Sequence, residues 1–145
     1  MITLRTLVAT AALVTMTPLP ICAADLRVVA SNDEEEILID VDSIQDVESS
    51  HHEATFISTY NTVQRATSDG PPFRVAVARI FFRCLDATGS LSKLSLFADA
   101  AAVQANKPTS KFDYPVIWKP VEPDSDVAVM WKYVCTKGWE AEGDK

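Results

Sequence analysis

The strongest constraint on this chain is a pair of cysteines, Cys84 and Cys135. They are the only thiols that remain once residues 1–24 are set aside as an export signal. A cysteine pair in a small exported domain is typical of one disulfide. The bridge would close a loop of about 50 residues, for which chain entropy gives a stabilisation of up to about 4 kcal/mol. We therefore predict a domain that is cross-linked between its middle and its C-terminal end.

Residues 1–24 have the layout of a cleaved secretory signal. Arg5 supplies a positive start, residues 7–19 form an uncharged apolar run, and the small residues of Cys22-Ala23-Ala24 precede Asp25. The apolar run is shorter than the roughly 20 residues that a membrane-spanning helix needs. We expect cleavage after Ala24 or, as the alternative, after Ala23.

Cys22 leaves a second interpretation of this signal open. Leu19 stands where a lipoprotein signal has its leucine, but the bulky Ile21 stands where a small residue is usual. An acylated Cys22 would hold the protein at a membrane surface instead of releasing it.

Residues 25–145 are long enough to form one domain with its own core. The full chain has 13 basic and 20 acidic residues, and removal of Arg5 leaves the mature part with a net charge of −8. Such a surface repels phosphate backbones, so we expect no nucleic-acid partner. No later run is apolar enough to cross a membrane, so we expect the mature chain to be soluble or peripheral.

Strand patterns dominate the first half of the mature chain. Short apolar runs predict strands at 26–30 and 36–40, and residues 42–44 are typical of a single turn capped by a short polar side chain. Residues 54–63 alternate between two sets of side chains and are rich in β-branched and aromatic types, which predicts a half-buried strand. The sequence Asp-Gly-Pro-Pro at 69–72 predicts a turn.

The next segment predicts a β-hairpin over 73–97. Its first strand is 73–84, its return strand is 91–97, and the loop at 86–89 contains a glycine that can adopt a positive φ. Strict alternation places one apolar set on the same face of the first strand: Ala76, Ala78, Ile80, Phe82 and Cys84. Residues 100–103 fit either a short strand or a helical turn, and 106–110 are expected to be loop.

The end of the chain changes from a strand period to a helix period. One stripe repeats at helical spacing and consists of Val127, Met130, Trp131, Val134 and Cys135. Cap residues and acids precede it at 123–126, where the helix dipole favours them. The β-branched content leaves a strand as the alternative. We expect Gly138 to end the helix and residues 138–145 to be a frayed tail.

These elements predict an α+β domain. Its antiparallel β-sheet would have five or six strands, with the C-terminal α-helix packed on one face and one disulfide between the hairpin and the helix.

Several short motifs resemble the surface-adhesin protein E family of small exported bacterial proteins. They are Asp-Val-Asp-Ser-Ile at 40–44, the strand that ends in Cys84, and Trp-Lys-Pro-Val-Glu-Pro-Asp-Ser at 118–125, which leads to Val134-Cys135. The resemblance covers most of residues 26–135. It implies an antiparallel sheet with a helix packed on it, and adhesive binding of host matrix proteins. The chain departs from the family pattern at position 121, where valine replaces isoleucine, and at 124, where aspartate replaces glycine.

Neither of the possible metal sites has a full set of ligands. His51 and His52 are followed by Glu53, but no further ligand stands at a diagnostic spacing, so we predict a solvated loop pair. Asp40 and Asp42 lack the glycine turn and the late glutamate of a calcium loop. Capping and turn formation explain these aspartates, and we predict neither a metal nor a cofactor.

The sequence also contains no catalytic motif. No serine stands in a Gly-x-Ser-x-Gly elbow, no glycine-rich phosphate loop exists, and paired cysteines are poor nucleophiles. Trp118, Trp131 and Trp139 could line a ligand groove, but aromatic side chains near a disulfide more commonly pack on it. We therefore predict that the protein is not an enzyme.

Two classes of function remain. The first is an exported binding protein, of which a surface adhesin for host matrix proteins is the specific form that the family resemblance implies. The alternative is a periplasmic structural or accessory protein of the envelope that binds another bacterial protein. In both, the partner is a protein.

Lys145 is the one residue that we single out as a partner contact. Its ammonium and the terminal carboxylate lie one side chain apart at the end of the tail. Kringle domains bind this pair of opposite charges, and the family resemblance implies plasminogen recruitment. A terminal lysine is also simply a common soluble chain end, and both interpretations stay open.

Overall fold

The computed structural model describes residues 24–48, 51–138 and 140. Most of the predicted signal, Trp139 and Lys145 lie outside these residues. The elements in chain order are β1 (Leu26–Ser31), β2 (Glu35–Glu48), β3 (His51–Arg65), β4 (Pro72–Arg83), β5 (Thr88–Phe97), α1 (Ala100–Gln104), β6 (Ser110–Asp113), β7 (Lys119–Pro120) and α2 (Asp126–Cys135).

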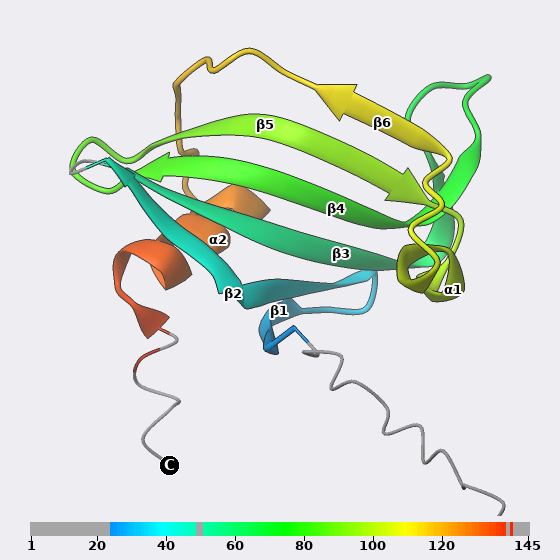
Figure 1. Cartoon of the computed structure of the whole chain (residues 1–145), viewed down its shortest axis with the longest axis horizontal. Coiled ribbons are helices and arrows are strands. Elements are labelled where there is room, and N and C mark those ends of the chain that lie inside the picture. The colour runs from blue at the N-terminus through cyan, green and yellow to red at the C-terminus, as the bar shows by residue number, and fades with distance from the viewer. Residues whose placement is uncertain (1–23, 49–50, 139, 141–145) are drawn as a thin grey trace, which may run out of the picture.

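The strands form one antiparallel sheet in which neighbours in sequence are neighbours in space. The order is β1-β2-β3-β4-β5-β6, and the two-residue β7 pairs with β5 on the same edge as β6. Figure 1 shows this meander from β1 at the bottom to β6 at the top, with α2 across one face of the sheet. The predicted antiparallel sheet with a C-terminal helix is confirmed.

The turn that we predicted at 42–44 is wrong, because these residues continue β2. The hydroxyl of Ser43 donates to the carbonyl of Asp40 at 2.6 Å and accepts the N–H of Thr55 at 2.8 Å. The side chain thus replaces backbone pairing at the register shift between Asp40 and Gln45. A polar pattern that resembles a cap serves here as a bulge within a long strand.

The predicted hairpin of β4 and β5 is confirmed, but its glycine has a different role from the one predicted. Ala87 takes the positive φ of 49° in the connecting turn, whereas Gly89 lies within β5. A Cβ at position 89 would come 3.4 Å from the ring of Phe82. A small side chain could be accommodated there at van der Waals contact, so neither a positive φ nor a steric clash requires glycine at this position.

The segment after the hairpin contains one helical turn and one strand that was missed. Residues 100–104 form α1, so the helical alternative is correct. The segment predicted as loop at 106–110 gives way to β6 at Ser110. In β6 the side chains are mostly exposed, so no buried alternation marked it as a strand.

The predicted C-terminal helix is confirmed as α2. Ser125 caps its start by accepting the N–H of Ala128 at 3.1 Å. The helix ends at Cys135, and Lys137 rather than Gly138 adopts the left-handed φ, at 55°. The prediction that Gly138 ends the helix is therefore wrong by about one turn.

The main core lies between α2 and the sheet. Its buried members come from alternate positions of the strands and from one stripe of the helix: Ile37, Ile39, Ala54, Phe56, Ile80, Phe82, Met130 and Val134. Trp131 is half-buried against this cluster, whereas Val127 stays 38% exposed. The predicted stripe therefore reaches the core everywhere except at its first residue.

The predicted disulfide is present. Cys84, directly after β4, is bonded to Cys135, the last residue of α2, and their Cα atoms lie 5.5 Å apart. Beside it, the indole Nε1 of Trp131 donates to the carbonyl of Arg83 at 3.2 Å. A covalent bond and a hydrogen bond thus hold the C-terminal half of α2 to one end of the hairpin.

Candidate binding groove

Residues 110–121, which we call the edge segment, run antiparallel along β5. The segment begins with β6 and continues to β7. Its last residue, Val121, donates its backbone N–H to the carbonyl of Ala87 at 2.9 Å. Between these points regular pairing is interrupted, and Ile117 donates its N–H to the hydroxyl of Ser90 at 2.9 Å. A side chain therefore holds the middle of the edge segment where the backbone ladder is absent.

The side chain of Trp118 attaches the part of the edge segment without regular pairing to the sheet. Its ring makes edge contacts with His51 at 5.5 Å and lies 6.5 Å from Phe81, and the guanidinium carbon of Arg83 lies 4.0 Å above it. Phe81 and Arg83 alternate with the core residue Phe82, so this cluster lies on the face opposite α2. Trp118 therefore holds the edge segment against the face of the sheet opposite α2. The other large apolar side chains of the segment remain exposed to solvent.

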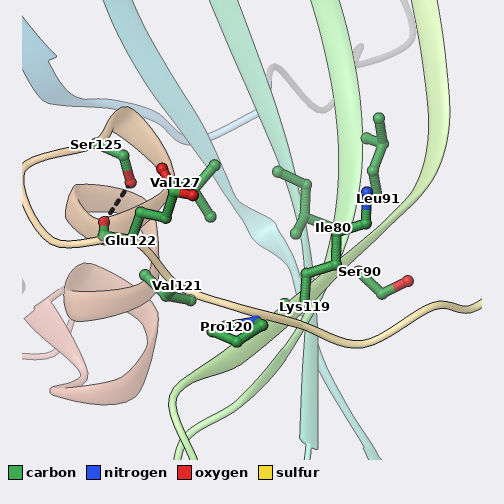
Figure 2. A pocket seen from close by; sticks show the side chains of 10 residues that line it. Ile80, Ser90, Leu91, Lys119, Pro120, Val121, Glu122, Ser125 and Val127 are labelled. Carbon is green, nitrogen blue, oxygen red and sulfur yellow. Dashed lines mark hydrogen bonds between the residues drawn. The ribbon is translucent and has the colours of Figure 1, made fainter.

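A groove of about 500 Å³ lies between α2, the start of β5 and the end of the edge segment. The helix packs mainly on β1, β3 and β4, so the start of β5 is left uncovered. Figure 2 shows Val127 and Glu122 on the helix side of the groove, and Ile80 and Leu91 on the sheet side. The other lining residues are Gly89, Ser90, Lys119, Pro120, Val121 and Ser125.

The walls of the groove are suited to binding apolar groups. Ile80 is buried in the floor, Leu91 and Val121 are half-buried, and Val127 is exposed beside them. The hydroxyls are already engaged: Ser90 accepts the N–H of Ile117, and Ser125 donates to the carbonyl of Glu122 at 2.6 Å. The chemistry left to a ligand is an apolar slot with one ammonium, from Lys119, and one carboxylate, from Glu122.

Further exposed apolar side chains lie at the β4–β5 turn and along the edge segment. Leu85, at the tip of the β4–β5 turn, is 95% exposed. The edge segment also presents four large apolar side chains: Phe112, Tyr114, Val116 and Ile117. Exposed apolar groups gathered in one region are typical of an interaction surface, whereas scattered ones are not.

The residues considered as metal ligands have structural roles. His51 and His52 belong to β3, so the solvated loop pair that we predicted is wrong. His51 packs edge-on against Phe81 and Trp118, whereas the ring of His52 pairs with Asp46. The carboxylate of Asp40 accepts the N–H of Asp42, a local contact at the register shift within β2 and not in a separate turn. Over the part of the chain that the structure describes, no group of three ligating side chains comes together.

Trp118 and Trp131, two of the tryptophans that we considered as groove residues, do not line it, and Trp139 lies outside the described residues. Trp131 lies beside the disulfide through its bond to Arg83, as the packing alternative predicted. Trp118 stacks on the side chain of Arg83 on the other face. Sequence reasoning missed the groove itself. Its lining residues come from β4, β5, the edge segment and α2, and no local motif connects them.

One electrostatic feature ties the start of α2 to the sheet. Glu35, at the start of β2, hydrogen-bonds to Asp126 in the first turn of the helix. Burial, this bond and the nearby charge of Asp126 raise the pKa of Glu35 to about 7. Burial also raises the pKa of Tyr60, which lies nearby. When Glu35 is protonated, its carboxyl group can share this proton with Asp126, which favours the contact between β2 and α2.

We expect the free energy of unfolding to fall as the pH rises through about 7. The folded pKa of Glu35 lies above its ordinary value of 4.5, so the stabilisation by the shared proton is complete below that value and is lost above pH 7. Urea denaturation at about pH 5.5 and about pH 8.5 measures this loss. Glu35→Gln should flatten the difference, and Glu36→Gln, an exposed neighbour, should not. An equal pH dependence in the two variants would contradict this assignment.

Within the described residues, no helix is long and apolar enough to span a membrane.

Comparison with known proteins identifies one family. No curated protein and no solved structure shows significant similarity to the chain. The family model described as surface-adhesin protein E matches residues 26–136, which covers β1 to α2 and both bonded cysteines. The chain therefore belongs to the surface-adhesin protein E family.

Proposed function

We propose that the mature chain is an exported, non-catalytic binding protein that acts as a surface adhesin for host matrix proteins. Membership of the adhesin family is the observation that carries the proposal. The exposed apolar side chains of Leu85 and of the edge segment support it, because exposed large apolar groups on neighbouring elements can form an interaction surface. The disulfide beside Leu85 keeps this surface rigid, which lowers the entropic cost of binding.

Binding of the mature protein to a panel of immobilised matrix glycoproteins tests this proposal. We expect Leu85→Ser to weaken binding about tenfold, since an exposed leucine at a rigid turn can act as an anchor in a partner's apolar pocket. The matched control is Val63→Ser. Val63 is 53% exposed near the end of β3, at the end of the sheet opposite the β4–β5 turn. Failure of the wild-type protein to bind any member of the panel would remove the matrix-protein proposal.

Location separates the adhesin role from the alternative one. An adhesin must be open to protease added to intact cells, whereas a periplasmic accessory protein must be protected until the outer membrane is broken. Surface proteolysis with immunodetection of the domain measures the difference. Protection in intact cells would remove the adhesin role and favour an accessory protein that binds another envelope protein.

For Lys145, which lies outside the described residues, the proposal is a contact with the kringle domains of plasminogen. The terminal ammonium and carboxylate form the charge pair that such lysine pockets recognise. We expect removal of Lys145, or addition of a soluble lysine analogue, to reduce plasminogen binding by the mature protein. Binding that is unchanged by both treatments would assign recognition to the folded surface instead.

A further inference from the structure

The groove beside α2 is a part of the core surface that the chain itself does not cover. Ile80, only 7% exposed, belongs to the main core, yet it also forms the floor of the groove. Val127 belongs to the core stripe of α2 by its spacing and remains exposed at the opposite wall. The volume of about 500 Å³ falls within the range of natural ligand sites and has room for several apolar side chains.

The helix side of the groove carries an excess of negative charge. Glu122 lies beside Val127 at the opening (Figure 2), and Asp124 follows it as an exposed residue of the same loop. Asp126, the third acid of this sequence, is engaged with Glu35 instead. The one cation that lines the groove is Lys119, which belongs to the opposite, edge-segment side. The mature chain as a whole carries a net charge of −8, so its field attracts basic partners.

We propose that this groove binds an extended protein segment that presents aliphatic side chains between basic residues. The aliphatic groups fill the slot formed by Ile80, Leu91 and Val127, and a basic residue pairs with Glu122 at the opening. The inference deepens the proposed function, on which it rests, by naming the chemistry of the partner. A strongly acidic partner would meet Glu122 and Asp124 and is disfavoured by like-charge repulsion.

A second copy of the chain is the rival occupant. Leu85 lies close to the groove, because the turn that carries it is tied to the edge segment by the bond between Val121 and Ala87. It could therefore enter the groove of a neighbouring molecule, and two such contacts could form at once. Both molecules would carry the same net charge of −8, however, which opposes their association.

The test uses a fluorescent peptide of sequence Gly-Lys-Leu-Lys-Leu-Lys-Gly and the mature protein. Two control peptides replace either all lysines by glutamate or both leucines by serine. We expect the first peptide alone to bind, with an affinity that decreases as salt is added. Fluorescence anisotropy measures the affinity. If the basic, leucine-containing peptide does not bind, or binds no better than either control, the proposal is overturned.

Two helix variants locate the binding site. Val127→Trp places a large ring in the groove, whereas Val129→Trp places the same ring on the helix face that does not line it. The two valines are 38% and 39% exposed, so both variants are expected to fold, which thermal melts will check. We expect Val127→Trp to weaken the peptide about tenfold and Val129→Trp to leave it unchanged. Equal effects of the two variants would overturn the proposal.

Two further measurements separate this inference from its rivals. Sedimentation that shows a dimer, abolished by both Leu85→Ser and Val127→Trp, would overturn the proposal in favour of self-association. Matrix-protein binding that Val127→Trp leaves unchanged would also overturn it, while the adhesin role would stand. Conversely, peptide binding in the groove without any matrix-protein binding would support the groove and remove the adhesin role.

Discussion

Replacing both Cys84 and Cys135 by serine is expected to lower the free energy of unfolding by up to about 4 kcal/mol. The bridge joins residues that are 51 positions apart, so its loss releases a long loop in the unfolded chain. It also frees the end of α2, which supplies Met130 and Val134 to the core. For a domain of this size, such a loss is a large fraction of the total stability. Urea denaturation of the oxidised wild type and the double variant measures the difference.

Reduction of the disulfide between Cys84 and Cys135 provides a chemical control. Reduction of the wild-type protein should lower its denaturation midpoint to nearly that of the double variant, and reduction should leave the variant unchanged. Thiol labelling of unreduced, unfolded protein should find no reactive pair in the mature chain. Two labelled thiols in that sample would contradict the bond between Cys84 and Cys135 in the cell.

Truncation of Trp131 to alanine is expected to cost about 3 kcal/mol, the low end of the range for large aromatic core residues. The side chain is half-buried against the main core, and its indole N–H donates to the carbonyl of Arg83 at 3.2 Å. Trp131→Phe keeps much of the packing and loses the hydrogen bond, so we expect a smaller loss of about 1 kcal/mol. Equilibrium denaturation of the two variants separates packing from hydrogen bonding.

Lys132 is the matched control for this prediction. It is the next residue of α2 and its side chain is exposed, so Lys132→Ala should change the free energy of unfolding by about half a kcal/mol or less. Similar losses for Trp131→Ala and Lys132→Ala would mean that this face of α2 does not rest on the core.

The sequence predicts most of the helices and strands because burial of one face sets the spacing of apolar residues along each of them. The alternation in β3 and β4 and the helical spacing of Met130 and Val134 exist because one face of each element must meet the core. The disulfide follows from the number of cysteines and from export. These predictions can be made without knowing which distant segments of the chain contact each other.

The remaining features depend on contacts that no local pattern encodes. Residues 42–44 resemble a cap, but Ser43 bonds to Thr55 on the neighbouring strand. Gly89 resembles a turn residue, but it lies within β5 and Ala87 takes the positive φ of the turn. The edge segment is held by Ser90 and Trp118 and not by alternation of its own. The groove was missed for the same reason.

The contact of α2 with β1 has a consequence for the order in which the elements can fold. Each strand of the meander pairs with the one before it, so hairpins can form one after another along the chain. The apolar side chains of β2, Ile37 and Ile39, have no lid until residues 126–135 arrive. The earliest hairpin therefore gains its apolar cover only when the last helix docks, and a chain that lacks this helix exposes an apolar sheet face that is prone to aggregate.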